Sequence, residues 1–510
     1  MPKTSITHTE YYGGARLPNP IRQLLLSPLL PVSLCIVVAV LLFPVSLHLS
    51  LAAVSFSYVF LSYYIERKNV DFLIIPPLAI LALYNLFSGS LGPVLLAGNL
   101  FSKEIDSLLI AHISYVVTFP LLLAIYWLVN SKNPPVLIPE GEGILSIVDN
   151  KQLRLIAFSL IVFTVCFHYV QISTGVEDRG YAGDIVLENP YGIWSYFIAF
   201  GQLQYVAYML IPYAYRNSNW VFRALLTGLL SFYLLFQVAN SSRGGIFFPF
   251  IFIVIGYWMI GGNFRRTVLT SLSLGVFMFI ITPIFGEFRS SGALQDTALI
   301  NVSDRIARFI ELQKSNAEFS AGRDNASRVM GAALLGCSDP IIYEYTPSLY
   351  PFAGWERFSG ILYAWLPSTF FPDKPQLNDG NMISSQYTGV YNERSGIGIK
   401  LQADLYRRFG WLGVFVGYPF FALLISLFAR YGFRSFSNSK TRVWGFIVIL
   451  FITTFLCANP FGTVLGMIWG ALYYYPKYLI ALALLVFASK TAAKFNMRIG
   501  HRFGFKYKGV

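Results

Sequence analysis

The sequence predicts an all-α polytopic membrane protein of about twelve transmembrane helices, with one large extracytoplasmic loop that contains short amphipathic helices. Fifty-five per cent of the 510 residues are hydrophobic and 12% are charged, whereas charged residues make up about a quarter of a soluble chain. Apolar runs of about 20 residues, the length that crosses the hydrocarbon core as a helix, recur along the sequence. The runs are continuously apolar rather than alternating, which disfavours a transmembrane β-barrel.

The expected spans follow one another closely up to residue 286 and resume at residue 411. Several contain proline, which membrane helices tolerate when neighbouring groups satisfy the freed backbone. The first span is followed at once by a second and has no small-residue cleavage site, so no removable signal peptide is expected. The twelve ranges are about 24–46, 48–65, 72–88, 106–129, 153–172, 193–213, 219–239, 245–260, 267–286, 411–430, 443–458 and 463–489.

The positions of Lys and Arg predict the orientation. With the N-terminus in the cytoplasm, clusters of basic residues fall in the loops on the cytoplasmic side and in the tail after residue 489, while the short loops on the other side contain just Lys103, Arg179 and Arg243. By the positive-inside rule, both termini are cytoplasmic and the long loop is extracytoplasmic. The net charge of +13 is explained by this orientation and by contact with membrane lipid, so no nucleic-acid partner is expected.

The long loop carries shorter patterns of its own. Residues 301–314 have apolar side chains at helical spacing and predict an amphipathic helix on the outer surface. Residues 326–336 are small and apolar and predict a second short helix. Residues 358–371 are apolar but too short to span, so an interfacial or re-entrant segment is expected. The predicted organisation is an N-terminal membrane domain of about nine helices (1–286), the large loop (287–410), and about three C-terminal helices with a basic tail (411–510).

Arg243 is the residue whose position most strongly indicates function. Residues 240–245 read Asn-Ser-Ser-Arg-Gly-Gly, a tight turn between two expected spans on the outer side. An arginine at the membrane boundary is costly and usually functional. Free backbone N–H groups at the start of the next span suit a phosphate or diphosphate. The alternative is a turn whose arginine extends to the lipid headgroups.

Further cationic candidates lie in the long loop. The segment Pro372-Asp373-Lys374-Pro375 is stiffened by two prolines and presents a charged pair, unless it is a simple turn. Arginine binds phosphate through two parallel hydrogen bonds. We therefore expect a subset of the loop cations to converge on an anion, while the others form surface ion pairs. The candidates include Arg289, Arg357, Lys374, Arg394, Arg407 and Arg408.

Carboxylates and histidines supply the candidates for general acid or base catalysis. Asp404 and Asp373 belong to the loop, and His168 lies near the outer end of the fifth expected span. A lone histidine in an apolar helix is more often a hydrogen-bonded packing residue. That alternative applies to His168 and to His112, which lies in the outer half of the fourth span.

Aromatic residues are concentrated between Tyr343 and Trp365, and Trp355 is the candidate among them for substrate binding. They form either a platform for sugar rings or an interfacial belt. The four cysteines show neither a CxxC pair nor a Cys/His ligand spacing, so no disulfide framework and no zinc site is expected. Walker, Rossmann and GxSxG patterns are absent from any soluble context, so no cofactor is expected.

Two stretches together carry a family pattern. The first is Ser242-Arg243-Gly244, which opens a span. The second runs from Phe371-Pro372-Asp373-Lys374-Pro375 to Asp404-Leu405-Tyr406-Arg407-Arg408-Phe409-Gly410, and Gly413 then leads into a span. In order and spacing the chain resembles bacterial oligosaccharide repeat-unit polymerases, the Wzy-type enzymes of O-antigen and exopolysaccharide synthesis. The expected span count and the single large outer loop fit the same family.

The resemblance implies a glycosyltransferase of the bacterial inner membrane that joins two polyprenyl-diphosphate-linked oligosaccharides at the outer face. A hydroxyl of one unit attacks the anomeric carbon of the other, and undecaprenyl diphosphate or a similar carrier leaves. Because that bond is already activated, neither a nucleotide nor a metal is expected, while a chain-length regulator protein is an expected partner. The implied roles are diphosphate binding by Arg243, Arg289, Arg357 and Lys374, proton removal by Asp404, Asp373 or His168, and sugar stacking by the loop aromatics.

Three other classes compete with this interpretation. A ligase-like glycan transferase shares the architecture and chemistry and differs in its acceptor. A polyprenyl-phosphate-sugar glycosyltransferase has acidic residues in its first outer loop, where this chain has His48 alone. A polysaccharide transporter or flippase predicts inverted repeats and a path of intramembrane charges, and neither is visible in the sequence.

Overall fold

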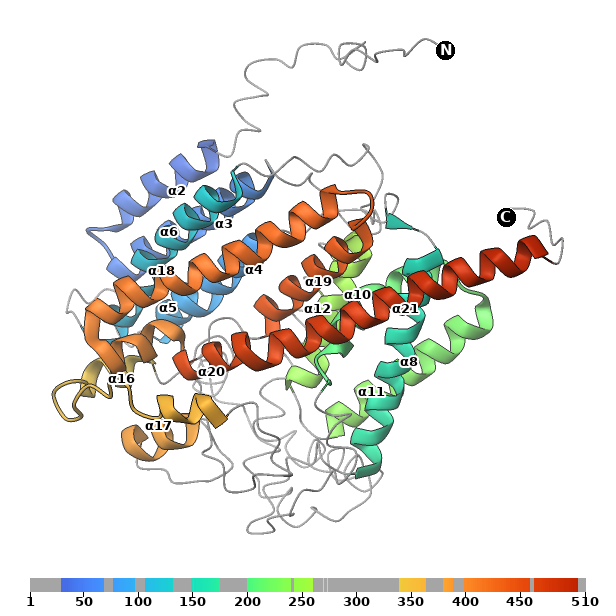
Figure 1. The fold of residues 1–510 in the computed structure, drawn as a ribbon. Helices are drawn as coiled ribbons and strands as arrows, with labels where there is room; N and C mark the ends of the chain where they lie inside the picture. Colours follow the sequence, from blue (N-terminus) through green and yellow to red (C-terminus); the bar gives the residue numbers. More distant parts are fainter. Residues whose placement is uncertain are drawn as a thin grey trace, which may run out of the picture.

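The structure is a computed structural model, and every regular element among the residues that it describes is a helix (Figure 1). The all-α prediction is therefore confirmed for this part of the chain. The described residues are 29–67, 77–96, 106–131, 148–149, 151–174, 200–239, 243–259, 269, 273, 339–363, 379–388, 399–458 and 463–502.

Most helices coincide with expected spans. The α-helices are α2 (Leu29–Leu42), α3 (Leu47–Arg67), α4 (Pro77–Tyr84), α5 (Gly92–Leu96), α6 (Ser107–Asn130), α8 (Lys151–Thr174), α10 (Leu203–Arg216), α11 (Trp220–Ala239), α12 (Arg243–Met259), α16 (Asp339–Tyr345), α17 (Asp379–Thr388), α18 (Leu401–Ser437), α19 (Arg442–Ala458), α20 (Val464–Trp469) and α21 (Tyr475–Arg502). Two π-helical segments, η2 (Asn85–Leu91) and η6 (Gly470–Tyr474), and the 3₁₀ helix η5 (Phe358–Tyr363) complete the described elements.

Five helices in the described part are long and apolar enough to cross a membrane. Four shorter apolar helices accompany them, within α2, α11, α12 and α19. The helices thus fit a multi-pass membrane protein, while the count of twelve spans and the orientation stay predictions. The expected span at 267–286 lies outside the described residues except for Leu269 and Ser273. The five long spans are Leu47–Ile65, Ser107–Asn130, Lys151–Val170, Leu401–Ser437 and Val464–Ala492.

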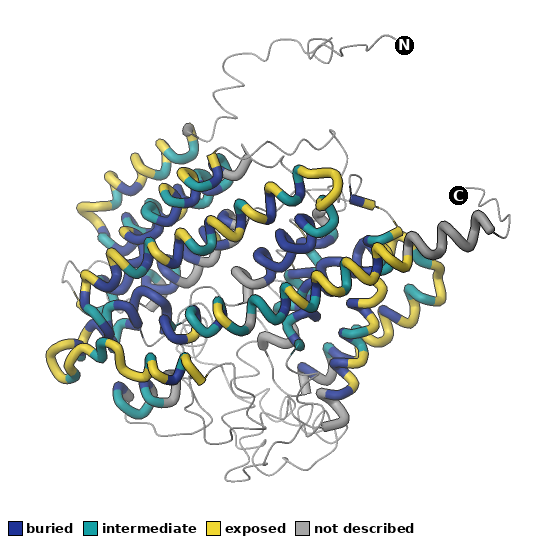
Figure 2. Tube along the Cα trace, in the orientation of Figure 1, coloured by how far each residue is buried: buried dark blue, intermediate teal, exposed yellow. Residues whose placement is uncertain are grey.

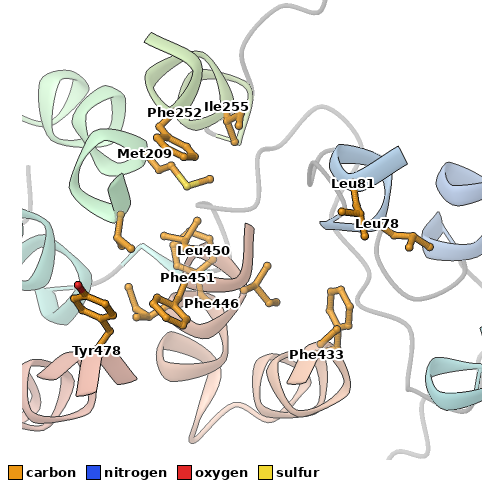
Figure 3. Close-up of a cluster of buried hydrophobic side chains, with 14 of the residues drawn as sticks. Leu78, Leu81, Met209, Phe252, Ile255, Phe433, Phe446, Leu450, Phe451 and Tyr478 are labelled. Carbon is orange, nitrogen blue, oxygen red and sulfur yellow. The ribbon is translucent and has the colours of Figure 1, made fainter. Parts of the chain in front are cut away.

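The helix α19 lies at the centre of the bundle. Its residues from Phe446 to Leu450 are at most 1% exposed, as expected for a helix that is apolar on all sides. Figure 3 shows side chains of α19 between Met209 of α10 and Tyr478 of α21. On the far side of Met209, α10 and α12 approach closely because Gly256 has no side chain. A Cβ atom at Gly256 would lie 2.0 Å from the Met209 carbonyl oxygen.

The outward faces of the bundle are apolar. Figure 2 shows exposed residues along the outer faces of α2, α18 and α21, with buried residues on the inner faces. Large side chains such as Leu34, Leu412 and Phe487 are 63%, 75% and 70% exposed, respectively. In water such apolar surface is unfavourable, whereas in lipid it requires no protein partner. The burial pattern therefore agrees with the hydropathy of the sequence.

Two segments differ from the expected spans. Of the expected span 72–88, the described residues from Pro77 onward form α4 and then the π-helical η2, which continues past residue 88 into α5. Pro93 of α5 has no N–H to continue a regular helix. The helix α18 begins at Leu401, before the expected start at 411, and Gly410 (φ 64°, ψ −158°) breaks it at the expected boundary between loop and membrane. Residues 401–409 form a helix because they bury their side chains against α6, α16 and α20.

Two helices of the long loop, α16 and α17, lie at the end of the bundle where α18 begins. They are at the lower left of Figure 1. Of the expected interfacial segment 358–371, the first residues form the 3₁₀ helix η5, and the rest lies outside the described residues. The helices expected at 301–314 and 326–336 also lie outside them.

Candidate functional site

Asp404 is the centre of a fully buried charged cluster at the start of α18. Its Oδ1 accepts from Arg407 through Nε at 2.9 Å and Nη2 at 2.7 Å. Its Oδ2 accepts from Arg408 Nε at 3.2 Å and from the backbone N–H of Val464 at 2.7 Å. We call Asp404, Arg407 and Arg408 the Asp404 cluster. Its carboxylate also joins α18 to the first residue of α20.

Helical spacing assembles this cluster. Residues three and four positions apart lie on the same face of a helix, so Arg407 and Arg408 both reach back to Asp404. A carboxylate near the helix N-terminus is also favoured by the helix dipole. The three side chains are at most 1% exposed. Together these groups carry a formal charge of +1, since two guanidinium groups share one carboxylate.

The geometry favours a positioning role for Asp404 over the expected role as a base. Both carboxylate oxygens already accept hydrogen bonds, and two of the three donor residues are positively charged. A base must present a free lone pair to the proton that it removes. Arg407, expected to bind substrate, is likewise buried and holds Asp404. The structure thus brings these two predicted residues together as partners of each other.

Arg408 joins the cluster to a surface turn formed by residues 352–358, which we call the 352–358 turn. Its Nη1 donates to the carbonyl oxygens of Gly354 at 3.2 Å and Glu356 at 2.9 Å. In return, the N–H groups of Ala353 and Gly354 donate to the carbonyls of Arg407 and Arg408 at 3.1 and 3.0 Å. These carbonyls accept from the turn because Gly410 interrupts the regular helix just after them.

The 352–358 turn presents Trp355 and Arg357 at the surface. Trp355 is 73% exposed and packs edge-on against Phe358 and Phe409, with ring centroids 4.8 and 5.0 Å away. Arg357 is exposed and has a φ of 63°, a left-handed conformation that is uncommon for a residue with a side chain. Strain of this kind is concentrated at functional sites. Both residues were candidates from the sequence, and the structure places them on one turn.

His168 lies elsewhere in the bundle. It is on α8, which is on the opposite side of Figure 1 from α16. Its Nε2 is 2.6 Å from the hydroxyl of Tyr208, and its ring stacks on Tyr233 at 3.5 Å between centroids. These contacts match the alternative of a hydrogen-bonded packing histidine, and the structure does not bring His168 to Asp404.

The remaining candidate residues lie wholly or partly outside the described part of the chain. Arg243 is the first residue of α12, as the turn predicted, but its side chain lies outside the described residues. Arg289, Asp373, Lys374 and Arg394 lie entirely outside them. Their expected roles in binding and catalysis therefore stay predictions.

A second buried carboxylate, Asp339 at the start of α16, was not predicted from the sequence. Asp339 is 1% exposed and accepts hydrogen bonds from the Tyr115 hydroxyl and, at 3.0 Å, from the Lys400 N–H. The Lys400 ammonium group lies 4.3 Å from the centroid of the Tyr115 ring. Burial raises the pKa of Asp339, an effect that these hydrogen bonds and the Lys400 charge oppose. An available signal was Asp339-Pro340, because proline favours the first turn of a helix.

A histidine pair includes His112 of α6, the helix that also carries Tyr115. The Nδ1 atoms of His48 on α3 and His112 on α6 are 3.2 Å apart, and both rings are buried. The starts of α3, α6 and α18 therefore lie at one end of the bundle, where the predicted topology places the outer face. Within the described part of the chain, no three His, Cys, Asp or Glu side chains come together as a metal site requires.

Comparison of the chain with protein-family models, with curated proteins and with solved structures gives no match.

Proposed function

We propose that the protein polymerises polyprenyl-diphosphate-linked oligosaccharide repeat units into a surface polysaccharide at the outer face of the bacterial inner membrane. The observation that carries the proposal is the Asp404 cluster. It lies in one of the two stretches that resemble repeat-unit polymerases, and Arg408 connects it to the turn that presents Trp355 and Arg357. Residues of a stretch that resembles the polymerases therefore hold a surface turn with an exposed aromatic and an exposed cationic side chain.

The proposed reaction is a glycosyl transfer that needs no nucleotide. The hydroxyl oxygen of the incoming unit forms a bond with the anomeric carbon of the growing chain, and the bond from that carbon to the diphosphate oxygen breaks. A protein base takes the hydroxyl proton, and the polyprenyl diphosphate leaves as an anion. Cations placed where the negative charge develops lower the barrier to this step.

The described residues suit three parts of this reaction. Arg357 offers a guanidinium group to the leaving diphosphate. Trp355 offers the face of an indole ring to a sugar. The Asp404 cluster holds the turn that carries both and adds its formal positive charge beneath them. Asp373 is the remaining candidate for the base, because His168 lies away from this turn. Arg243, Arg289, Lys374 and Arg394 are the further candidates for anion binding.

The proposed setting follows from the hydropathy and charge pattern. Both termini lie in the cytoplasm, and the long loop, with α16 and α17, faces outward. The active site then meets lipid-linked units at the outer face, where a chain-length regulator protein would contact the same loop.

A genetic experiment tests this proposal. The gene is deleted in its host and restored as wild type, as Trp355→Ala or as Trp220→Ala, and surface glycans are sized on gels. Trp220 is a matched control because it is 77% exposed but lies at the start of α11, far along the chain from the site. We expect single repeat units in the deletion strain, long chains with wild type and Trp220→Ala, and shortened chains with Trp355→Ala.

Other outcomes of this experiment identify the competing classes. Unchanged chain length in the deletion strain contradicts the polymerase. Long polymer that accumulates without attachment to its acceptor indicates a ligase-like transferase. Repeat units trapped on the cytoplasmic side indicate a flippase. Equal effects of the two tryptophan variants would assign Trp355 to an interfacial belt instead of a sugar platform.

A further inference from the structure

An apolar groove lies between α6 and α18, directly below the Asp404 cluster along α18. The cavity has a volume of about 240 Å³ and is lined by Ile113, Ser114, Val117, Thr118, Trp411 and Phe415. We call it the α6–α18 groove. Pockets that hold a whole small molecule are about 300–1,000 Å³. This groove therefore fits a segment of a longer ligand and is too small for an oligosaccharide.

The polar atoms of the groove are engaged within the protein. The Ser114 hydroxyl donates to the Ala111 carbonyl at 2.7 Å and accepts from Tyr343 at 2.9 Å. The Thr118 hydroxyl donates to the Ser114 carbonyl at 2.7 Å and accepts from Gln402 at 3.3 Å. Because these hydroxyl groups are satisfied, the groove offers a ligand methyl groups and rings, and it selects a hydrocarbon.

The groove opens toward the lipid. Val117, Trp411 and Phe415 at its edge are 44%, 39% and 46% exposed. Both helices that form it are long and apolar enough to span a membrane. Val117 lies roughly 15 Å along α6 from Ser107 at 1.5 Å per residue, which is about half of the hydrocarbon thickness. With the predicted topology, the groove occupies the outer half of the bilayer.

A row of aromatic rings connects the groove to the 352–358 turn. The ring of Phe352 contacts Tyr406 at 6.1 Å between centroids, Tyr406 contacts Trp411 at 5.2 Å, and Trp411 contacts Phe415 at 6.0 Å. Tyr343 of α16 packs against both Tyr406 and Trp411, at 4.7 and 5.9 Å. The apolar wall is therefore continuous from the proposed reaction site down into the membrane.

We propose that the α6–α18 groove binds a segment of the polyisoprenoid chain of the lipid-linked donor, next to the diphosphate. The inference rests on the proposed function and adds a binding site to it. The geometry favours a polyisoprenoid as the occupant of the groove. Its chain must leave the reaction site through apolar surface, and the aromatic row leads from the 352–358 turn to this groove. Phospholipid acyl chains, which reach every outward face of the bundle, are the competing occupant.

Photocrosslinking in nanodiscs tests the binding site without any sugar or turnover. Val117→p-benzoylphenylalanine and Val162→p-benzoylphenylalanine variants of the full chain are illuminated with undecaprenyl diphosphate, and adducts are measured by mass spectrometry. Val162 on α8 is also 44% exposed, and it lies at a similar depth in its span but outside the groove. We expect isoprenoid adducts at position 117 at least about fivefold above those at position 162, and reduced by excess unlabelled carrier.

Equal adducts at the two positions, or adducts of phospholipid alone at position 117, would overturn the groove assignment. Because this readout requires no polymer, selective labelling with no polymerase activity would reject the proposed function and keep the lipid site. Equal labelling at positions 117 and 162 in a protein that does polymerise would reject the lipid site and keep the proposed function.

A second variant connects the groove to substrate use. Val117→Trp fills the groove from its exposed edge, and Val162→Trp is its control. With undecaprenyl-linked units, we expect Val117→Trp to raise KM about tenfold, because several buried methylene groups lose their contacts. With a two-isoprene carrier, the same change should stay under about twofold, because that short chain gains little from the groove. Equal effects on both carriers would contradict an isoprenoid site.

Discussion

Arg408 Nε lies 3.2 Å from Asp404 Oδ2, and both side chains are fully buried. The same guanidinium group also donates to the Glu356 carbonyl at 2.9 Å. One residue therefore connects the helix that enters the membrane to the surface turn that carries Trp355 and Arg357. The buried Asp404–Arg408 pair therefore holds an exposed turn in place, although neither of the two side chains reaches the surface.

Asp404→Asn is expected to destabilise the protein. The substitution removes the negative charge that two buried guanidinium groups share, and breaking a buried ion pair costs about 3–5 kcal/mol. We expect a lower thermal midpoint in detergent, faster proteolysis of the 352–358 turn and loss of polymer in cells. A variant that unfolds at the wild-type temperature and yet loses all activity would contradict the positioning role and favour Asp404 as the base.

Gly410→Ala tests the break in α18. Gly410 has a φ of 64°, and a Cβ atom there would lie 3.2 Å from Phe352 Cζ. With a ψ of −158°, this backbone conformation is essentially restricted to glycine and costs a residue with a side chain about 1–3 kcal/mol. The displaced Phe352 ring adds to this cost. We expect a lower midpoint of thermal unfolding and shorter polymer, because the turn loses its anchoring.

The matched control for Gly410→Ala is Gly228→Ala. Gly228 lies inside α11 and would place its Cβ atom in open space. Alanine is favoured over glycine in a helix by about 0.5–1 kcal/mol, so this variant should be as stable as the wild type or slightly more stable. Equal losses in the two variants would show that the break at Gly410 has no special role.

The sequence was sufficient for most of the described helices, while the pairing of Asp404 with Arg407 and Arg408, which their spacing allows, was not predicted. The helices follow from the length of the apolar runs, and the Asp404 cluster follows from positions three and four residues apart on one helix. These signals are local, so a single sequence contains them. The span expected from residue 411 agrees with the break in α18 at Gly410. The helix at 401–409 was not predicted, because its charged residues suggested an aqueous loop, while the structure buries Asp404, Arg407 and Arg408 as mutually compensating groups.

The contacts between distant segments were not predictable in this way. Asp339 meets Tyr115 and Lys400, and His48 meets His112, only through the packing of separate helices. No spacing rule connects residues that are so far apart in the chain. His168 shows the converse case, because its place in an outer helix end suggested a shared site, and the bundle directs it to Tyr208 and Tyr233 instead.

Arg357→Gly tests the role of the guanidinium group, because it removes the side chain at a position where glycine fits the backbone. Glycine adopts the φ of 63° that Arg357 has without steric cost, so we expect the backbone of the 352–358 turn to keep its conformation. Polymerisation should nevertheless fall about tenfold or more, because a charged contact to the leaving diphosphate is lost. Glu356→Ala on the same turn is the control. Wild-type polymer length with Arg357→Gly would remove Arg357 from the anion site.

Asp339 should make stability depend on pH. Burial raises its pKa above the value of about 3.9 of an unfolded chain, so the folded protein holds this proton more tightly. Its contribution to stability is complete below about pH 3.9 and is lost as the pH rises through the raised pKa. Asp339→Asn keeps the shape of the carboxylic acid and does not titrate. Thermal midpoints from pH 4 to neutral should therefore fall less in Asp339→Asn than in the wild type, and parallel curves would show that Asp339 is ionised in the folded protein at every pH tested.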